Sequence, residues 1–305
     1  MLTKSNIKSF KSFLFSLLLL LTFGCGIKME HGVKKSDLQK DVSLKTEMGF
    51  IILRLSDDTP KHRDNFIKLI NQGFYDGIAF HRVINKFLVQ TGNPETKTTP
   101  SAVPETAYTI PAEIHPSHFH KRGAVNAARM GDNYNPSQAS SGTQFTIIQG
   151  KTYTDSTLAI AEKRINNWLA YNKVINDPNH KSLFEAYTDI LKELDTLYAS
   201  DSKEDIARIA NLVNSSAAMK TKLDSLTELA KTTMTPYVYP ETHRSMYKTH
   251  GGAAHLDQNY VVFGEVIKGM DIVDRIATVQ TDSLDKPISD VRILSATMIE
   301  RASNK

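Results

Sequence analysis

The stretch GIAFHRVINKFLVQTG, residues 77–92, places the consecutive residues Phe80, His81 and Arg82 inside a strand-like apolar run. A second apolar run follows and ends on Gln90. A half-buried strand alternates apolar and polar residues, so a guanidinium at this point needs a specific partner. Two interpretations stay open on these residues alone. Arg82 either pairs with a loop carbonyl as a structural residue, or it faces a pocket and binds a substrate.

Strand-like runs recur on both sides of this stretch. The segment VSLKTEMGFIILRL, residues 42–55, contains two such runs around Met48-Gly49, which indicates a hairpin. Helices are predicted between Pro60 and Gly73 and over about 270–277. Many short strands with two helices predict a mainly β, α+β domain that is closed or sandwiched. The further predicted strands are 79–84, 87–91, 123–128, 143–149, 260–266 and 290–300.

Residues 151–248 follow a different pattern. Apolar residues recur there at helical spacing in three runs, over 183–197, 206–213 and 219–229. We therefore predict an inserted all-helical segment. Its apolar faces are expected to form a core of their own or to pack on the β domain, rather than to build a cofactor site. A surface that recruits a client or partner is the alternative.

The first 24 residues are typical of a secretory signal. Lys4, Lys8 and Lys11 precede an apolar run over residues 13–23, which ends close to small residues. A helix of this length is too short to cross about 30 Å of hydrocarbon. We expect residues 1–24 to be removed as a signal peptide.

Cys25 is the only cysteine in the sequence, so no disulfide can form within the chain. Its place directly after the apolar run and Gly24 resembles the junction of a bacterial lipoprotein. A buried or free thiol is the alternative, but an exposed thiol is a liability in an oxidising compartment. We expect lipidation at Cys25, a flexible tether over 25–40, and a location in the cell envelope, either facing the periplasm or on the outer membrane.

The composition is that of an ordinary globular protein, with 40% hydrophobic and 23% charged residues. Removal of residues 1–24 takes away three lysines and no acidic residue, which lowers the formal net charge from +4 to +1. A chain so close to neutral has no excess of basic charge to hold a polyanion. We expect no nucleic-acid partner.

Three segments in one order carry a family resemblance. They are similar to the signatures of the cyclophilin-type peptidyl-prolyl cis-trans isomerases. The resemblance implies an eight-stranded antiparallel β-barrel capped by two helices, formed by residues 41–150 and 249–302, with 151–248 inserted in a loop beside the binding groove. The matching segments are GFYDGIAFHRVINKFLVQTGN (73–93), GAVNAARMGD (123–132) with SSGTQFTII (140–148), and HLDQNYVVFGEVIKGMDIVDRIA (255–277).

The same resemblance implies roles for individual residues. Arg82 matches the catalytic arginine, which would donate a hydrogen bond to the prolyl nitrogen of the substrate. Gln90 matches a glutamine that binds the substrate backbone and steadies this arginine. Such chemistry needs neither a metal nor another cofactor, and we expect none. The implied substrate-binding residues are Phe87, Leu88, Ala128, Arg129, Gln144, Thr146, Leu256 and Tyr260. Of these, Phe87 and Leu88 would line the proline pocket, and the main chain at Ala128 and Arg129 would bind the peptide.

The sequence departs from the family pattern at two positions. Thr146 stands where an aromatic residue is usual, which predicts a wider and more polar pocket. His255 takes the position of a tryptophan associated with cyclosporin sensitivity, which predicts weak binding of that drug. The histidines of HPSHFH, residues 115–120, raise the question of a metal, but no cysteine accompanies them and Pro116 indicates a loop. No metal site is predicted, and His81 is expected to be a packed, hydrogen-bonded strand residue.

The leading functional prediction is a lipid-anchored, monomeric peptidyl-prolyl isomerase that acts on extended X–Pro segments of folding or secreted polypeptides. The alternative is a weakly active or inactive chaperone or binding module of the same fold, which holds its clients through the helical insert. Thr146 and the size of the insert motivate the alternative.

Overall fold

The computed structural model describes residues 29–30, 32–97, 108–199 and 206–302. Within these ranges no helix is both long and apolar enough to cross a membrane. The predicted signal segment and Cys25 lie outside the described residues. The chain divides into two compact units, residues 1–39 and residues 40–305.

The described part of the first unit is small. It contains β1 (Met29–Glu30), which pairs antiparallel with β2 (Val33–Lys34). A short 3-10 helix, η2 (Asp37–Gln39), follows. These residues belong to the predicted tether.

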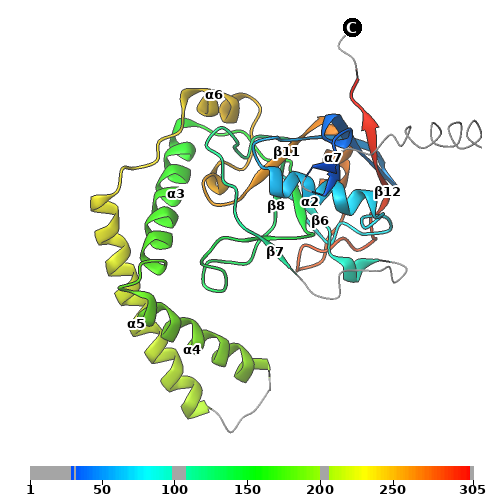
Figure 1. Cartoon of the computed structure of the whole chain (residues 1–305). Helices are drawn as coiled ribbons and strands as arrows, with labels where there is room; N and C mark the ends of the chain where they lie inside the picture. Colours follow the sequence, from blue (N-terminus) through cyan, green and yellow to red (C-terminus); the bar gives the residue numbers. More distant parts are fainter. Residues whose placement is uncertain (1–28, 31, 98–107, 200–205, 303–305) are drawn as a thin grey trace, which may run out of the picture. The chain divides into compact units, whose positions relative to one another are not determined.

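The second unit contains one large antiparallel sheet. Its strands are β3 (Lys40–Thr46), β4 (Gly49–Leu55), β5 (Arg82–Ile84), β6 (Leu88–Thr91), β8 (Ala124–Ala127), β10 (Phe145–Ile148), β11 (Val262–Lys268) and β12 (Ile293–Glu300). They follow the order β12-β3-β4-β11-β8-β10-β6-β5 (Figure 1). Each of the eight strand-like runs in the sequence supplies one of these strands, so the predicted mainly β fold is confirmed. A separate pair joins β7 (Thr109–Ile110) to β9 (Ser140–Ser141).

The sheet curls, and its two edges are joined by irregular backbone rather than by a ladder between β12 and β5. The N–H of Gly77 donates to the carbonyl of Ile293 at 2.8 Å, and the N–H of Ile293 donates to the carbonyl of Ile78 at 2.9 Å. Just before β5, the N–H of Phe80 donates to the carbonyl of Val291 at 2.8 Å. These bonds satisfy backbone groups that an open edge would leave unpaired. The predicted eight-stranded barrel is confirmed in this form.

Two helices cap the sheet, as predicted. Helix α2 (Pro60–Asn71) begins on a proline, and Gly73 follows its end with a left-handed φ of 65°. Its Phe66 ring lies 5.1 Å from the ring of Phe145 and 5.3 Å from the ring of Phe263. Helix α7 (Met270–Ala277) packs against β4 and β6. Full burial of each such aromatic ring contributes roughly 1.5–3 kcal/mol, so this aromatic cluster is a major part of the core.

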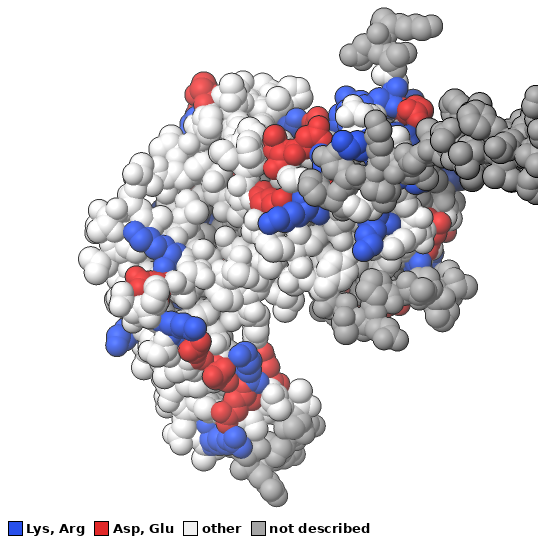
Figure 2. All heavy atoms as spheres, in the orientation of Figure 1, with Lys and Arg blue, Asp and Glu red and all other residues white. Residues whose placement is uncertain are grey.

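Among the described residues, four helices lie between the second and third signature segments. They are α3 (Asp155–Ile175), α4 (Lys181–Ala199), α5 (Ile206–Thr233) and α6 (Glu241–Thr249) (Figure 1). Helices α3 and α4 both pack against α5. Acidic and basic side chains lie side by side over α4 and α5, with no large region of one sign on the face shown in Figure 2. The predicted helical character of this segment is confirmed.

A buried cluster joins these helices to the barrel sequence. It contains Leu158, Ala161 and Ile165 of α3, together with Tyr247 of α6 and Ala254 of η5 (Ala254–Leu256). Beneath it, the buried carboxylate of Asp257 accepts hydrogen bonds from the Tyr247 hydroxyl at 2.7 Å and from the His120 N–H at 2.8 Å. Burial raises the pKa of Tyr247, so its hydroxyl stays a donor. The apolar face of α3 therefore packs on the β domain. This is one of the two arrangements expected for the helical segment, the other being a core of its own.

Gly252 makes the tightest part of this junction. A Cβ atom at this position would lie 2.3 Å from the carbonyl oxygen of His120 and 2.9 Å from the Cα of Lys121, and the φ of Gly252 is +156°. We predict that Gly252→Ala lowers the free energy of unfolding by about 1–3 kcal/mol, because backbone has to move. Chemical denaturation checks this. The control is Gly131→Ala, where nothing lies within 4 Å; equal effects of the two substitutions would contradict the account.

Candidate active site

One row of side chains crosses five neighbouring strands of the sheet. Arg82 on β5 lies directly opposite Gln90 on β6, and Gln90 lies opposite Thr146 on β10. Thr146 lies opposite Asn126 on β8, which in turn lies opposite Val262 on β11. Directly opposed residues in an antiparallel pair point to the same face. The pairing therefore gathers these side chains on one face of the sheet.

The residues between the members of this row point to the other face. Val83, Val89 and Ile147 are opposed in the same way and are at most 2% exposed. Phe145, one position before Thr146, joins the aromatic cluster around Phe66. The sheet therefore has an apolar inner face and a partly polar outer row.

A cavity of about 600 Å³ lies over the row, a size within the range of small-ligand sites. All of the predicted catalytic and substrate-binding residues except Gln144 line it. They are Arg82, Phe87, Leu88, Gln90, Ala128, Arg129, Thr146, Leu256 and Tyr260. The structure thus brings together residues from three distant segments of the sequence, while their roles stay predictions.

The floor of the cavity is apolar. Leu88 and Leu256 are buried in a cluster with Val262, against which Phe87 and Tyr260 pack. The ring of His255 lies beside that of Phe87, with the centroids 5.4 Å apart. A surface of this kind removes apolar groups from water and suits a compact ring such as that of proline.

Arg82 stands at the edge of this floor with a carboxylate partner. Its Nε lies 3.5 Å from Oδ2 of Asp285, and both side chains are about half exposed. The carbonyl of Asp285 accepts from the N–H of Val83 at 2.8 Å, which fixes its loop beside β5. Sequence reasoning missed Asp285. It lies in the turn TDSLDKP, residues 281–287, in which no motif points to Arg82.

Gln90 and Gln144 form a separate polar pair. The Nε2 of Gln90 donates to Oε1 of Gln144 at 3.1 Å, so Gln144 lies beside the row although it does not line the cavity. His81 is partly buried, and this burial lowers the pKa of its imidazole. Its main-chain N–H donates to the carbonyl of Gln90 at 3.0 Å.

Arg129 uses its guanidinium within the chain. Its Nε donates to the carbonyl of Asn259 at 2.9 Å, and a terminal nitrogen lies 2.7 Å from Oδ1 of Asp132. The guanidinium carbon lies 4.7 Å from the centre of the Tyr260 ring. The side chain of Arg129 therefore holds Tyr260 in position at the wall of the cavity.

The main chain at Ala128 is also bonded. Its N–H donates to the carbonyl of Gln144 at 3.0 Å, and its carbonyl accepts from the N–H of Ser141 at 2.7 Å. A carbonyl oxygen has two lone pairs, so this one keeps a site for a peptide N–H. Of the two main-chain groups of Ala128, the carbonyl is thus the better placed to bind a substrate.

Thr146 is buried and makes a hydrogen bond across the sheet. Its Oγ1 donates to Oδ1 of Asn126 at 2.5 Å, and both residues line the cavity. Sequence reasoning missed Asn126, since an asparagine within a run of small residues carries no signal of its own. The polar character expected at Thr146 therefore comes from a pair of residues.

Two residues of α3 complete the cavity wall. Arg164 and Trp168 both line it, and Trp168 is the only tryptophan of the chain. Sequence reasoning missed them, because helical periodicity does not show which surface a helix covers. The helical segment thus contributes directly to the candidate active site.

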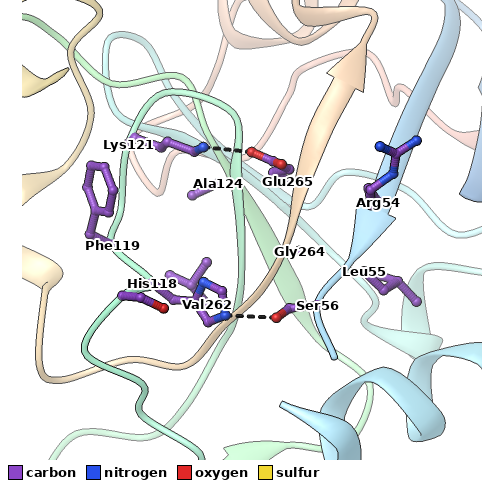
Figure 3. Close-up of a pocket in the computed structure, with 11 residues that line it drawn as sticks. Arg54, Leu55, Ser56, His118, Phe119, Lys121, Ala124, Val262, Gly264 and Glu265 are labelled. Atoms are coloured by element: carbon purple, nitrogen blue, oxygen red, sulfur yellow. Dashed lines mark hydrogen bonds and ion pairs between the residues drawn. The ribbon is translucent and has the colours of Figure 1, made fainter. Parts of the chain in front are cut away.

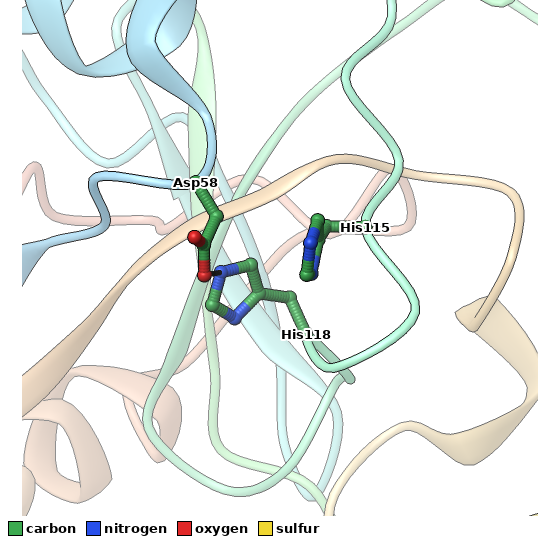
Figure 4. Close-up of side chains that lie close together, drawn as sticks. All are labelled: Asp58, His115 and His118. Carbon is green, nitrogen blue, oxygen red and sulfur yellow. Dashed lines mark ion pairs between the residues drawn. The ribbon is translucent and has the colours of Figure 1, made fainter.

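The histidines of residues 115–120 fall into two environments. His115, His118 and Asp58 each place a possible ligand atom within 4.8 Å of the others, and in the described part of the chain this is the group that could hold a metal ion (Figure 4). The Nε2 of His118 already has two partners, Ser56 Oγ at 2.7 Å and Asp58 Oδ2 at 3.0 Å. His120 is separate, with Nδ1 at 2.8 Å from Asp257 Oδ1.

A second cavity, of about 290 Å³, lies beside His118. Lys121 and Glu265 face each other across its upper edge at 2.7 Å, and Ser56 bonds His118 at the opposite edge (Figure 3). Burial lowers the pKa of His118, with Asp58 opposing this effect. Each polar group named here has a partner in the chain.

The fold and the main cavity together define a β-barrel with an apolar pocket beside an arginine. The family model described as "Cyclophilin type peptidyl-prolyl cis-trans isomerase/CLD" matches residues 41–172 and 240–298. The chain belongs to this family of isomerases, as the sequence resemblance implied.

Two relatives have names that agree with this family, and one solved structure is also similar. A protein of Staphylococcus haemolyticus named "Putative peptidyl-prolyl cis-trans isomerase" is 26% identical over 262 residues, which cover 85% of this chain and 91% of the relative. A protein of the same name from Staphylococcus saprophyticus is 26% identical over 258 residues, covering 84% and 88%. The crystal structure of a cyclophilin-type isomerase from Cryptosporidium parvum covers 86% of this chain and 99% of its own, with 15% identity and a TM-score of 0.47.

His255 makes the stability of the fold depend on pH. Burial, together with the positive charge of Arg164, lowers the pKa of His255 to about 4, against an ordinary value of 6.5. Between these two values the unfolded chain binds a proton that the folded chain excludes. Stability therefore falls as the pH falls through this window, by at most about 1.4 kcal/mol per pH unit from this residue.

We predict that His255→Gln makes the free energy of unfolding less dependent on pH between 6.5 and 4. Urea denaturation at a series of pH values measures this dependence. The control is His250→Gln, because His250 is an exposed histidine close to His255 in the sequence. A pH dependence that is the same in His255→Gln and in the unaltered protein would contradict the prediction.

Proposed function

We propose that the protein accelerates cis–trans isomerisation of X–Pro bonds in folding or secreted polypeptides, with Arg82 as the hydrogen-bond donor to the prolyl nitrogen. The observation that carries this proposal is the shared cavity. It combines the guanidinium of Arg82 with the apolar floor of Phe87, Leu88 and Leu256. The shared family of isomerases supports the same reaction.

The chemistry needs a donor and a fixed substrate. Amide resonance gives a peptide bond a rotation barrier of ~18–20 kcal/mol. In the twisted transition state this resonance is lost, and the prolyl nitrogen gains a basic lone pair. A donor at that nitrogen stabilises the twisted form more than the planar one, which is the condition for catalysis. A ten-thousandfold acceleration requires about 5.5 kcal/mol.

The residues of the cavity can supply both parts. The guanidinium of Arg82 offers several N–H donors in a planar fork, and Asp285 holds it at the cavity edge. The apolar floor takes the proline ring, and the Ala128 carbonyl and the Gln90 side chain can bind the backbone on either side. The polar pair of Thr146 and Asn126 reduces the apolar area around the ring, which predicts a modest turnover.

We predict that Arg82→Ala lowers kcat/KM for a proline tetrapeptide by about 100- to 1,000-fold, as the loss of one transition-state donor does elsewhere. Exchange NMR of the cis and trans peptide signals measures it. Arg208→Ala, which removes an exposed arginine paired with Glu193 on the helices, is the control. Full activity in Arg82→Ala would refute the proposed role.

The binding-module alternative has one observation in its favour. Large apolar side chains are exposed on the helices, among them Ile160, Tyr198 and Leu229. A module of this kind suppresses aggregation of an unfolded client with little turnover. Absence of isomerisation by the unaltered protein, combined with suppression that persists in Arg82→Ala, would favour it.

We further propose that the protein is a monomeric lipoprotein of the cell envelope, anchored through Cys25 and acting on proline-containing clients. The support is the sequence alone, in which Cys25 follows a signal-like segment. We predict that fatty-acid labelling in cells is lost in Cys25→Ala and that the variant moves to the soluble fraction. Labelling that persists in Cys25→Ala would contradict the anchor.

A further inference from the structure

The wall that α3 adds to the cavity has its own chemistry. Arg164 and Trp168 are four residues apart, so they project from the same face of the helix. The guanidinium carbon of Arg164 lies 4.5 Å from the centre of the Trp168 ring. Both residues line the cavity. They come from the helical segment and lie outside the three signature segments.

Helix α3 is held at both ends of this wall. On the N-terminal side, Leu158 and Ile165 are buried with Ala254, the residue before His255 in the cavity. On the C-terminal side, the Tyr171 hydroxyl donates to Asn133 Oδ1 at 2.8 Å, and Asn172 Nδ2 donates to the carbonyl of Pro136 at 3.1 Å. The helix is therefore a fixed part of the site.

The three arginines of the cavity differ in their partners. Arg82 faces Asp285 at 3.5 Å, and Arg129 faces Asp132 at 2.7 Å. In the described part of the chain, the partner of Arg164 is the Trp168 ring rather than a carboxylate. Arg164 is also exposed, whereas the Arg129 side chain is 2% exposed. Its N–H groups are thus available to a ligand.

We propose that Arg164 and Trp168 form a subsite that binds the carboxylate of an Asp or Glu side chain within one or two residues of the client's proline. The contact with the indole face leaves the N–H groups of the guanidinium free to donate, and this planar fork can form two parallel hydrogen bonds to a carboxylate. The positive charge of Arg164 reaches the pocket, where it contributes to the lowered pKa of His255. This inference rests on the proposed function, because it assigns a peptide preference to the same groove.

The sole tryptophan gives a direct measurement. Titration of the full mature protein with capped peptides of sequence Ala-Glu-Pro-Phe and Ala-Gln-Pro-Phe, and with Ala-Pro-Glu and Ala-Pro-Gln counterparts, is followed by Trp168 fluorescence. We expect a Glu peptide to bind about tenfold more tightly than its Gln counterpart in at least one pair. Raising the salt concentration from about 0.05 M to about 0.5 M should reduce this preference.

Variants of α3 distinguish binding at the subsite from a general effect of net charge on the preference for Glu. Arg164→Gln should abolish the preference for Glu, and Arg164→Lys should retain part of it, since lysine keeps the charge without the planar fork. Lys163→Gln removes the same charge from the neighbouring exposed position and should keep the whole preference. Equal affinities for Glu and Gln peptides in both pairs, or a preference that survives Arg164→Gln, would overturn the subsite.

The outcomes also separate the subsite from the reaction. Isomerisation of a Gln peptide that is lost in Arg82→Ala supports the proposed function whatever the Glu preference is. A Glu preference in binding that disappears in Arg164→Gln supports the subsite even if no peptide is turned over.

Discussion

The register between β5, β6, β10 and β8 is the constraint on which the site depends. Each of Arg82, Gln90, Thr146 and Asn126 lies directly opposite the next one, so a shift of one residue in any of these strands would turn its member of the row toward the core. The register is fixed from the other face. There Phe145, packed against Phe66, occupies the alternate position of β10. The packing that buries the aromatic core therefore also places the side chains of this row on the cavity face.

A second constraint comes from the buried carboxylate of Asp257. It accepts from Tyr247 of α6 and from His120, and it lies one residue after Leu256 of the cavity floor. A buried carboxylate without such partners would be strongly destabilising, so these contacts hold the end of the helical segment against the barrel. Helix α3 packs on the same junction through Leu158 and Ile165, and its Arg164 and Trp168 line the cavity.

Local patterns in the sequence predicted the strands and the capping helices because each depends on a short window. Alternation marks the strand runs, and Gly73 ends α2 through its left-handed φ. The first signature segment also predicted that Arg82, Phe87 and Gln90 lie at one site, and all three line the same cavity. The partners of these residues were not predictable in the same way. Asp285 meets Arg82 across some two hundred residues of chain, and Asn126 is set opposite Thr146 only by the register.

The structure of the protein in complex with a capped Ala-Glu-Pro-Phe peptide tests the central claim most directly. The account predicts that the proline ring lies on Phe87, Leu88 and Leu256, with the Arg82 guanidinium facing the prolyl nitrogen. A peptide bound elsewhere on the chain, or a proline in this cavity whose nitrogen faces away from Arg82, would contradict it.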